Sequence, residues 1–569
     1  MIMNRLLIAA TLLVNVSAMS GLKLPTIIGD NMILQQHQKN TLWGWAEPGK
    51  RVSVKASWGA CATTVAGKNG KWTVFLDTPG YGTGKTLTIS CGDETVTIHD
   101  VDIGEVWLCA GQSNMGWSTG NSFEVEKESK VNLPHFRIFK SLREHWHEPL
   151  EMARDRLARW KKCTPESAAE TSAVSYYFGK KLHQALGIPV GIVVQAYAGT
   201  PIEGWMPESA QKNDPRLKLH KAKYEAAAKR QIERGMTEEK ALARFEKELA
   251  EYNRKIDAGE TMKNKVKPLA PPRITQPATL SHQWPGNIFN AMIYPIIPYG
   301  IRGMIWYQGE RNAKTCQQAA NYTLQLKELI TYYRKIWYER SGGNNDKNFP
   351  VFFTQLPSWK APQTEPVESA VESPWIVSRE SMLRATYEIP NTGMVVSIDT
   401  GDSVALHPKN KKPIGIRHAY LALKRVYGKN IVDSGPIYRK YTIRGHEIVL
   451  EFDSVGSGLM PAKPGKLNAF AIAGEDRKWH WADARIVGNT VVVSSPEVPK
   501  PVAVRYAWAM NPSQRNLLYN KEGLPASPFR TDHWPLCDPN AEPVEIKKPP
   551  KDRAHKKEAK DWYRPPMPQ

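Results

Sequence analysis

EVWLCAGQSNMGW, residues 105–117, is an apolar run that breaks abruptly into small and polar residues. A short apolar run that ends at a glycine is typical of a buried strand, and the polar residues after it would begin a turn or a helix. Ser113 lies just past the end of this expected strand. A serine in that place is either a helix cap or a nucleophile held for attack, and the remaining sequence has to distinguish the two.

From about residue 101 onward, apolar runs alternate with segments that have helical periodicity. This alternation predicts βαβ units around a parallel sheet and therefore the α/β fold class. The further expected strands are VGIVVQA (190–196), RGMIWYQ (302–308), PVFFTQL (350–356) and GMVVSID (393–399), and the expected helices cover 172–186, 319–337 and 414–428.

The 569 residues are too many for one hydrophobic core, so several domains are expected. Short alternating runs separated by Gly, Pro and Asn turns predict an N-terminal β domain over 21–100 and a C-terminal β domain over 431–536. The α/β domain would span 101–430 between them. Residues 537–569 are rich in Lys, Pro and Glu and predict a flexible basic tail.

Residues 209–262 interrupt the α/β pattern with a stretch rich in Ala, Lys and Glu. Apolar residues at helical spacing predict an inserted helical hairpin with its turn near Gly235 and Thr237 as the cap of its second helix. Such an insertion could be a substrate lid. The interpretation favoured by its charge is a solvated insertion without a role at the site.

The N-terminus predicts export. Residues 1–18 combine Arg5, an apolar core and the small-residue sequence Val16-Ser17-Ala18, which is typical of a secretory signal peptide. No later run reaches the roughly 20 apolar residues of a spanning helix. A secreted or periplasmic protein without a transmembrane segment is therefore expected.

The chain has a net charge of +21 and six cysteines. Such a charge could attract acidic glycans by long-range steering, or it could simply belong to solvated faces. No nucleic-acid-binding motif accompanies the charge, so no nucleic-acid partner is expected. In an exported chain Cys61 and Cys91 are candidates for a disulfide. The histidines of EHWHE (144–148) lack a third ligand, so we expect a polar surface and no metal there.

Complementary polar residues follow the expected strands. Ser113, Gly199, Gln308, Glu310 and His407 all come just after a strand, and the carboxyl ends of parallel strands meet at one edge of a sheet. A serine needs an imidazole to accept its proton, and acyl transfer needs N–H donors for an oxyanion. The sequence therefore predicts Ser113 as nucleophile and His407 as base. The backbone of Ser113 and Gly199 and the side chain of Gln308 would supply the donors.

Four longer motifs carry a family resemblance. GEVWLCAGQSNM, AYAGTPIEGWM, RGMIWYQGERN and LHPKNKKPIGIRHA resemble the sialate O-acetylesterase family, which is of the SGNH/GDSL type. The resemblance implies a flavodoxin-like, three-layer α/β domain flanked by β-sandwich-like domains. It also implies removal of O-acetyl groups from sialic acids or related sugars, with no cofactor, and it assigns the same roles to Ser113, Gly199, Gln308 and His407.

The acidic member of the triad is the open point. SGNH enzymes usually carry an aspartate two or three residues before the histidine, where this chain has Ala405 and Val404. Without an acid, a base histidine loses control of its tautomer and stabilisation of its imidazolium form. The alternatives are Glu310, Asp402, or a Ser–His dyad.

Two residues are expected to contact substrate. Arg379 could bind a sugar carboxylate or hydroxyl, and Trp205 could stack on a sugar ring, although core packing is the common role of tryptophan. Two other functions stay possible: an acetyl-xylan or other polysaccharide deacetylase with the same mechanism, and a non-catalytic glycan-binding protein that has lost its acid.

Overall fold

The computed structural model describes residues 21–123, 125–128, 130–260 and 278–537. The expected signal peptide and nearly all of the expected tail lie outside these residues. Within the described part, no helix has the length and apolar character needed to cross a membrane.

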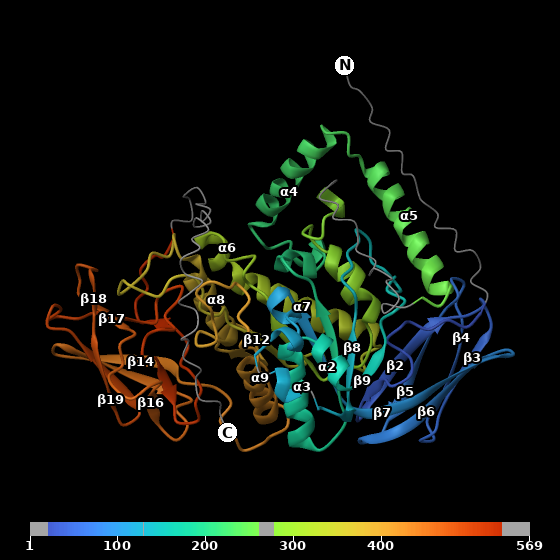
Figure 1. The fold of residues 1–569 in the computed structure, drawn as a ribbon, viewed down its shortest axis with the longest axis horizontal. Helices are drawn as coiled ribbons and strands as arrows, with labels where there is room; N and C mark the ends of the chain where they lie inside the picture. The colour runs from blue at the N-terminus through green and yellow to red at the C-terminus, as the bar shows by residue number, and fades with distance from the viewer. Residues whose placement is uncertain (1–20, 124, 129, 261–277, 538–569) are drawn as a thin grey trace.

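A parallel sheet forms the centre of the molecule (Figure 1). The chain order reverses at its long strand β7, because the next parallel partner along one side is β10 and along the other side β11. A ligand crevice is expected beyond the carboxyl ends of the strands at such a switch point. The spatial order is β13 (Thr392–Val395), β12 (Val351–Thr354), β11 (Gly303–Tyr307), β7 (Glu94–Gly111), β10 (Val190–Ala196), β8 (Leu133–Lys140) and the antiparallel edge strand β9 (Trp160–Cys163).

Helices cover both faces of this sheet. Along β7, Leu108 and Ala110 join one hydrophobic core, while Trp107 and Cys109 join the other, as the period of two of a strand requires. The first core includes residues of α7 (Tyr322–Arg340) and α8 (Pro374–Glu388), and the second includes residues of α3 (Ala173–Leu186) and α9 (Lys412–Arg425). The expected α/β class is confirmed, with three layers.

Antiparallel strands precede the central sheet and run into it. The 18-residue strand β7 pairs with β6 over its first half and with β10 and β11 over its second half, so the expected boundary at residue 100 falls inside one strand. The antiparallel strands are β2 (Gln38–Trp45), β3 (Arg51–Ala56), β4 (Cys61–Val65), β5 (Lys71–Thr78) and β6 (Gly82–Cys91), and β1 (Ile33–Gln35) before them pairs with β7 in parallel.

The expected Cys61–Cys91 disulfide is wrong. The two cysteines lie on β4 and β6, which flank opposite sides of β3, and both are free thiols. The structure instead joins Cys316 to Cys537, with 6.0 Å between their Cα atoms. This bond ties the first residue of α6 (Cys316–Ala320) to the end of the described chain.

The C-terminal strands form small antiparallel sheets with a core of their own. They lie at the end of the molecule opposite to the N-terminal strands (Figure 1). One sheet has the order β14 (Ile437–Arg444), β15 (Glu447–Asp453), β20 (Thr490–Ser494), β19 (Asp483–Val487); another has β18 (Trp479–Trp481), β17 (Phe470–Ala473), β21 (Ala503–Tyr506), β23 (Phe529–Arg530); β16 (Leu459–Pro461) pairs with β22 (Leu518–Asn520).

The insertion forms two helices, as predicted. They are α4 (Leu217–Ile232) and α5 (Glu238–Asp257), with Gly235 in the connection. The Thr237 side chain caps α5 by accepting a hydrogen bond from the Lys240 N–H at 3.3 Å, which confirms the expected cap. The helices splay apart as an arch above the α/β part (Figure 1).

Candidate active site

Ser113 begins the short helix α1 (Ser113–Gly116), two residues after β7 ends. The chain makes a sharp turn there, with Gly111 at φ +149°. A side-chain carbon at Gly111 would lie 2.1 Å from the carbonyl oxygen of Tyr307 on the neighbouring strand, so only glycine fits. This close approach places Ser113 at the switch point of the sheet.

His407 reaches Ser113 from a loop 294 residues further along the chain. Its Nε2 lies 2.8 Å from Ser113 Oγ, which confirms that the two side chains meet. The imidazole stacks on the Trp117 ring, with 5.4 Å between ring centroids and 19° between planes. Burial, and then the charge of Lys411, lower the pKa of His407, so the ring is neutral and able to accept a proton at pH 7.

A buried polar network lies behind this pair. Asn114 Nδ2 donates to Glu310 Oε1 at 2.5 Å and to the Leu406 carbonyl oxygen at 3.2 Å, while Lys411 Nζ donates to Asn114 Oδ1 at 2.5 Å. Burial raises the pKa of Glu310 and lowers that of Lys411 to about 7. Asn114 therefore ties the residue before His407 to the turn that carries Ser113.

Neither expected acid contacts His407. The Glu310 carboxylate is bonded to Asn114, as described. Asp402 Oδ1 accepts the backbone N–H groups of Val404 at 2.8 Å and Ala405 at 2.7 Å, and so shapes the loop that leads to the histidine. In the described part of the chain, no hydrogen bond or ion pair of His407 Nδ1 with a carboxylate is present.

Gly199 lies beside the serine turn. Tyr197, two residues before it, donates its N–H to the Gly111 carbonyl at 3.0 Å. Gly199 has φ +74°, and a side-chain carbon there would meet no described atom within 4 Å. The backbone N–H groups of Ser113 and Gly199 have no acceptor among the described residues, so both are available to a ligand.

The Gln308 side chain is fully buried and already occupied. Its Nε2 lies 3.0 Å from the Thr200 carbonyl oxygen and 2.8 Å from Asn312 Oδ1, and its Oε1 accepts from the Tyr322 hydroxyl at 2.5 Å. The structure therefore does not support the expected donation from Gln308 to an oxyanion. This side chain holds the backbone just after Gly199 instead.

The expected substrate contacts of Arg379 and Trp205 are not supported either. Both side chains are completely buried. Arg379 donates to backbone carbonyl oxygens, including those of Leu356 at 2.8 Å and Ala509 at 2.7 Å. Trp205 packs edge-on against Trp306. Both residues stabilise the core because no part of either side chain reaches solvent.

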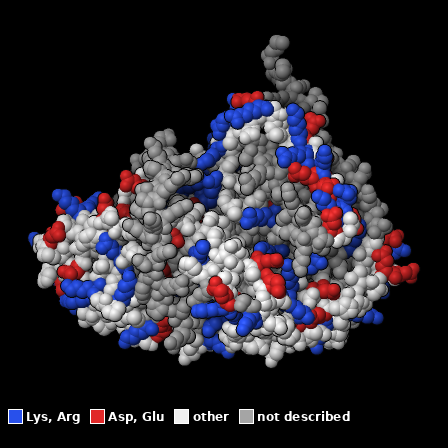
Figure 2. All heavy atoms as spheres, viewed as in Figure 1, with Lys and Arg blue, Asp and Glu red and all other residues white. Residues whose placement is uncertain are grey.

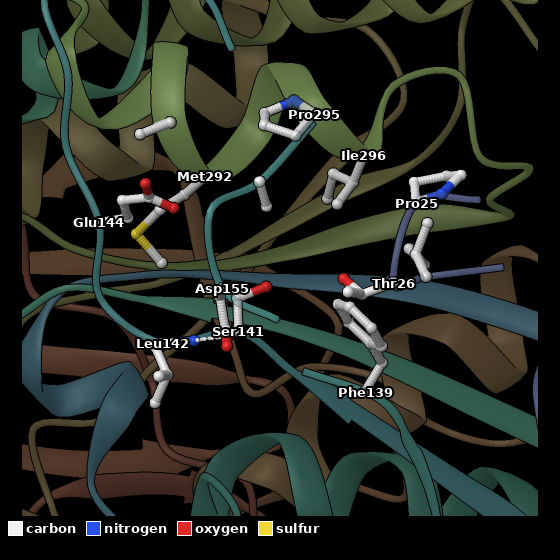
Figure 3. Close-up of a pocket in the computed structure, with 13 residues that line it drawn as sticks. Pro25, Thr26, Phe139, Ser141, Leu142, Glu144, Asp155, Met292, Pro295 and Ile296 are labelled. Atoms are coloured by element: carbon white, nitrogen blue, oxygen red, sulfur yellow. Dashed lines mark hydrogen bonds between the residues drawn. The ribbon is translucent and has the colours of Figure 1, made fainter. Parts of the chain in front are cut away.

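Glu144 and His145 of the EHWHE segment are buried and Glu148 is exposed, so only part of the segment forms the expected polar surface. Glu144 and Asp155 line a small pocket of about 10 Å³, too small for a sugar (Figure 3). Burial raises the pKa of Glu144 to about 7, and Asp155 accepts the Leu142 N–H at 2.7 Å. His145 Nδ1 lies 3.3 Å from the Tyr197 hydroxyl. The described residues contain no group of three or more side chains that could hold a metal ion.

Sequence reasoning missed Trp117, Asn114 and Lys411. Trp117 and Asn114 belong to the same motif as Ser113, and Lys411 comes four residues after His407. This closeness in sequence was the signal that could have placed them at the site. Their residue types carry no catalytic pattern of their own.

Comparisons with known proteins show which family the chain resembles. The family model described as "Carbohydrate esterase, sialic acid-specific acetylesterase" matches residues 103–242 and 283–423. The chain is 27% identical to the sialate O-acetylesterase of Mus musculus over 90% of this chain and 95% of that protein, and 26% identical to that of Homo sapiens over 90% and 93%.

A carbohydrate acetylesterase from Xanthomonas citri has a similar solved structure, with a TM-score of 0.72 and 31% identity over 90% of this chain and all of that one. A serine–histidine pair at a sheet edge, in a fold shared with this enzyme, defines the class: the protein is a carbohydrate esterase. The chain belongs to the sialic acid-specific acetylesterase family.

Proposed function

We propose that this protein is an SGNH-type serine esterase that removes O-acetyl groups from sialic acids or related acetylated sugars through an acetyl-enzyme. The observation that carries the proposal is the 2.8 Å distance between His407 Nε2 and Ser113 Oγ at the switch point of the sheet. This distance allows direct proton transfer from the hydroxyl to the imidazole.

In the first half-reaction, Ser113 Oγ attacks the acetyl carbonyl carbon and its proton passes to His407 Nε2. The tetrahedral anion collapses, the bond to the sugar oxygen breaks, and His407 returns the proton to that oxygen. In the second half-reaction, His407 takes a proton from water, which attacks the acetyl carbon. The bond from that carbon to Ser113 Oγ then breaks, His407 returns the proton to Oγ, and the acetic acid released ionises to acetate. Atoms and protons balance without a cofactor.

The anion formed in each step needs hydrogen-bond donors. The backbone N–H groups of Ser113 and Gly199 fill this role, because neither has an acceptor in the described part of the chain and the loop of Gly199 is bonded to the turn that carries Ser113. Gln308 is a positioning residue, since its amide fixes Thr200 at 3.0 Å and thereby the loop that presents Gly199.

The base works as part of a Ser–His dyad. Trp117 holds the His407 ring by stacking, and Asn114 holds the preceding backbone carbonyl. Glu310 acts through Asn114, and Asp402 acts through the turn before the histidine. Both acids are therefore positioning residues, not partners of the imidazole.

The test uses the full chain and p-nitrophenyl acetate. Ser113→Ala should abolish release of p-nitrophenol and prevent labelling by a fluorophosphonate, while the circular dichroism spectrum stays unchanged. A Ser113→Ala variant that keeps its activity would overturn the assignment. Binding of acetylated glycans by the unaltered protein without labelling of Ser113 would favour a glycan-binding function instead.

The choice of sugar is tested separately. Acetate release from 9-O-acetylated sialic acid, compared with release from acetylated xylan, distinguishes a sialate esterase from a polysaccharide deacetylase. Export by the segment 1–18 is part of the proposal, and N-terminal sequencing of the mature protein tests it.

A further inference from the structure

We infer that Arg311 binds the carboxylate of an acidic O-acetylated sugar, and that the inserted helix α4 forms the wall that holds this arginine in place. The inference rests on the proposed function, because it names the chemical class of sugar that the same site accepts.

Arg311 lies at the catalytic edge, four residues beyond the end of β11 and directly after Glu310. A single side-chain amide separates its guanidinium from the oxyanion loop. Gln283 Oε1 accepts from Arg311 Nη2 at 2.6 Å, and Gln283 Nε2 donates to the Gly199 carbonyl oxygen at 3.3 Å. Through Gln283, Arg311 and the loop of Gly199 are therefore parts of one connected site.

The guanidinium of Arg311 is half-buried and has no carboxylate partner among the described residues. Its protein contacts are two neutral oxygens, Gln283 Oε1 and the Tyr224 hydroxyl at 3.2 Å. Two buried arginines are neutralised by a carboxylate: Arg417 pairs with Asp399, and Arg505 pairs with Asp532 at 2.8 Å. The buried Arg379 has backbone carbonyl oxygens as its acceptors instead.

The remaining donors of Arg311, Nε and Nη1, have no protein acceptor in the described part of the structure. A carboxylate can accept a charge-assisted hydrogen bond from either of these free N–H groups, and it would also neutralise the guanidinium. The carboxylate of the sugar would therefore supply the negative partner that Arg311 lacks among the described residues.

The inserted helix holds this arrangement. The Tyr224 hydroxyl of α4 bonds to Gln283 Oε1, and His220, one turn earlier, lies 2.8 Å from the Gln283 carbonyl oxygen through its Nε2. The first turns of α4 therefore contact the site, contrary to the favoured expectation of a solvated insertion without a role.

The charge of α4 points to the same ligand class. Its sequence has five Lys or Arg residues and one Glu, whereas α5 has five basic and six acidic residues. Figure 2 shows Lys and Arg side chains along the arm of the arch formed by α4. A positive helix beside the site raises the local concentration of an anionic substrate.

The experiment compares two forms of one sugar, 9-O-acetylated sialic acid and its uncharged carboxamide. The readout is the ratio of kcat/KM for the acid to kcat/KM for the carboxamide, because a folding defect lowers both values alike. Arg311→Gln should reduce this ratio by roughly 10- to 100-fold, the range expected for lost hydrogen bonds to a charged group. Arg384→Gln, on the exposed face of α8, is the matched control and should leave it unchanged.

Two further variants keep the inference testable if Arg311→Gln does not fold. Arg311→Lys keeps the charge without the planar fork, so the ratio should fall less than in Arg311→Gln. Tyr224→Phe removes only the supporting hydroxyl and should lower the ratio a few-fold. A ratio that stays at the wild-type value in all three variants would overturn the inference.

Failure of the proposed function gives a different result. In that case Ser113→Ala hydrolyses p-nitrophenyl acetate as fast as the unaltered protein, whatever Arg311 does. An active, Ser113-dependent esterase that prefers the carboxamide would refute the carboxylate site alone.

Discussion

Replacing Glu310 with Gln separates a catalytic triad from the dyad proposed here. Glu310 Oε1 accepts a hydrogen bond from the Asn114 side chain at 2.5 Å, and none from His407 is present among the described residues. Glutamine offers an acceptor oxygen at the same reach, so the hydrogen bond is kept and only its charge-assisted part is lost. That loss is about 1 kcal/mol, or roughly fivefold in rate if it acts fully on the transition state.

A triad acid predicts a far larger effect. Replacing the acid that orients a base histidine lowers kcat by about 10⁴-fold. Steady-state kcat/KM for p-nitrophenyl acetate at pH 7.5 therefore distinguishes the two mechanisms without ambiguity. A fall of more than about 10³-fold in a variant with an unchanged melting temperature would refute the dyad.

The control for this measurement is Glu105→Gln. Glu105 is also a buried carboxylate, but it lies on β7 six residues before Gly111 and pairs with Arg302 at 2.7 Å. Its replacement should lower the melting temperature while kcat/KM changes little, because it is about 20 Å of strand away from Ser113.

Three further outcomes follow from the same contacts. The pH profile of kcat/KM should have its acidic limb below the ordinary pKa of histidine, 6.5, because burial and Lys411 lower the pKa of His407. Lys411→Met removes the positive charge that lowers the pKa of His407, so the acidic limb should move to higher pH. Lys409→Met is the control, because Lys409 is exposed on the same loop, and it should leave the limb unchanged. Arg379→Met should lower the melting temperature strongly, because the Arg379 side chain bonds to backbone carbonyl oxygens inside the core. The fraction of the variant that folds should keep the KM of the unaltered protein. Asp402→Ala frees two N–H groups of the loop before His407 and should lower kcat by about 10-fold with KM nearly constant, measured by steady-state kinetics.

Sequence pattern was sufficient for five strands of the central sheet, which are β7, β10, β11, β12 and β13, and for the meeting of Ser113 with His407. Parallel strands place their carboxyl ends at one edge of the sheet, whatever the length of chain between them. Residues that follow different strands could therefore be assigned to one site although they are far apart in the sequence. The strand β8 was not predicted. Its Arg137 is completely buried, paired with Asp102 at 3.0 Å, and a charged residue inside a buried strand hides the apolar pattern.

The details around the catalytic pair depend on packing that a sequence does not show. Asn114 and Lys411 are 297 residues apart and interact through side chains. Arginine is common in binding sites, and for that reason Arg379 was expected to contact substrate. It lies on α8, a helix that was not predicted, and the backbone around residues 356 and 509 encloses its side chain. Only the arrangement of those chain segments in space determines that its donors are satisfied inside the protein.

Because β7 belongs to two sheets, the N-terminal strands and the nucleophile share one piece of backbone. Removing residues 21–100 would leave Arg137 without its partner Asp100 at 3.1 Å and would strip the first half of the strand that ends at the Ser113 turn. The N-terminal strands therefore anchor the turn of Ser113, the proposed nucleophile, and the two parts should melt in a single transition.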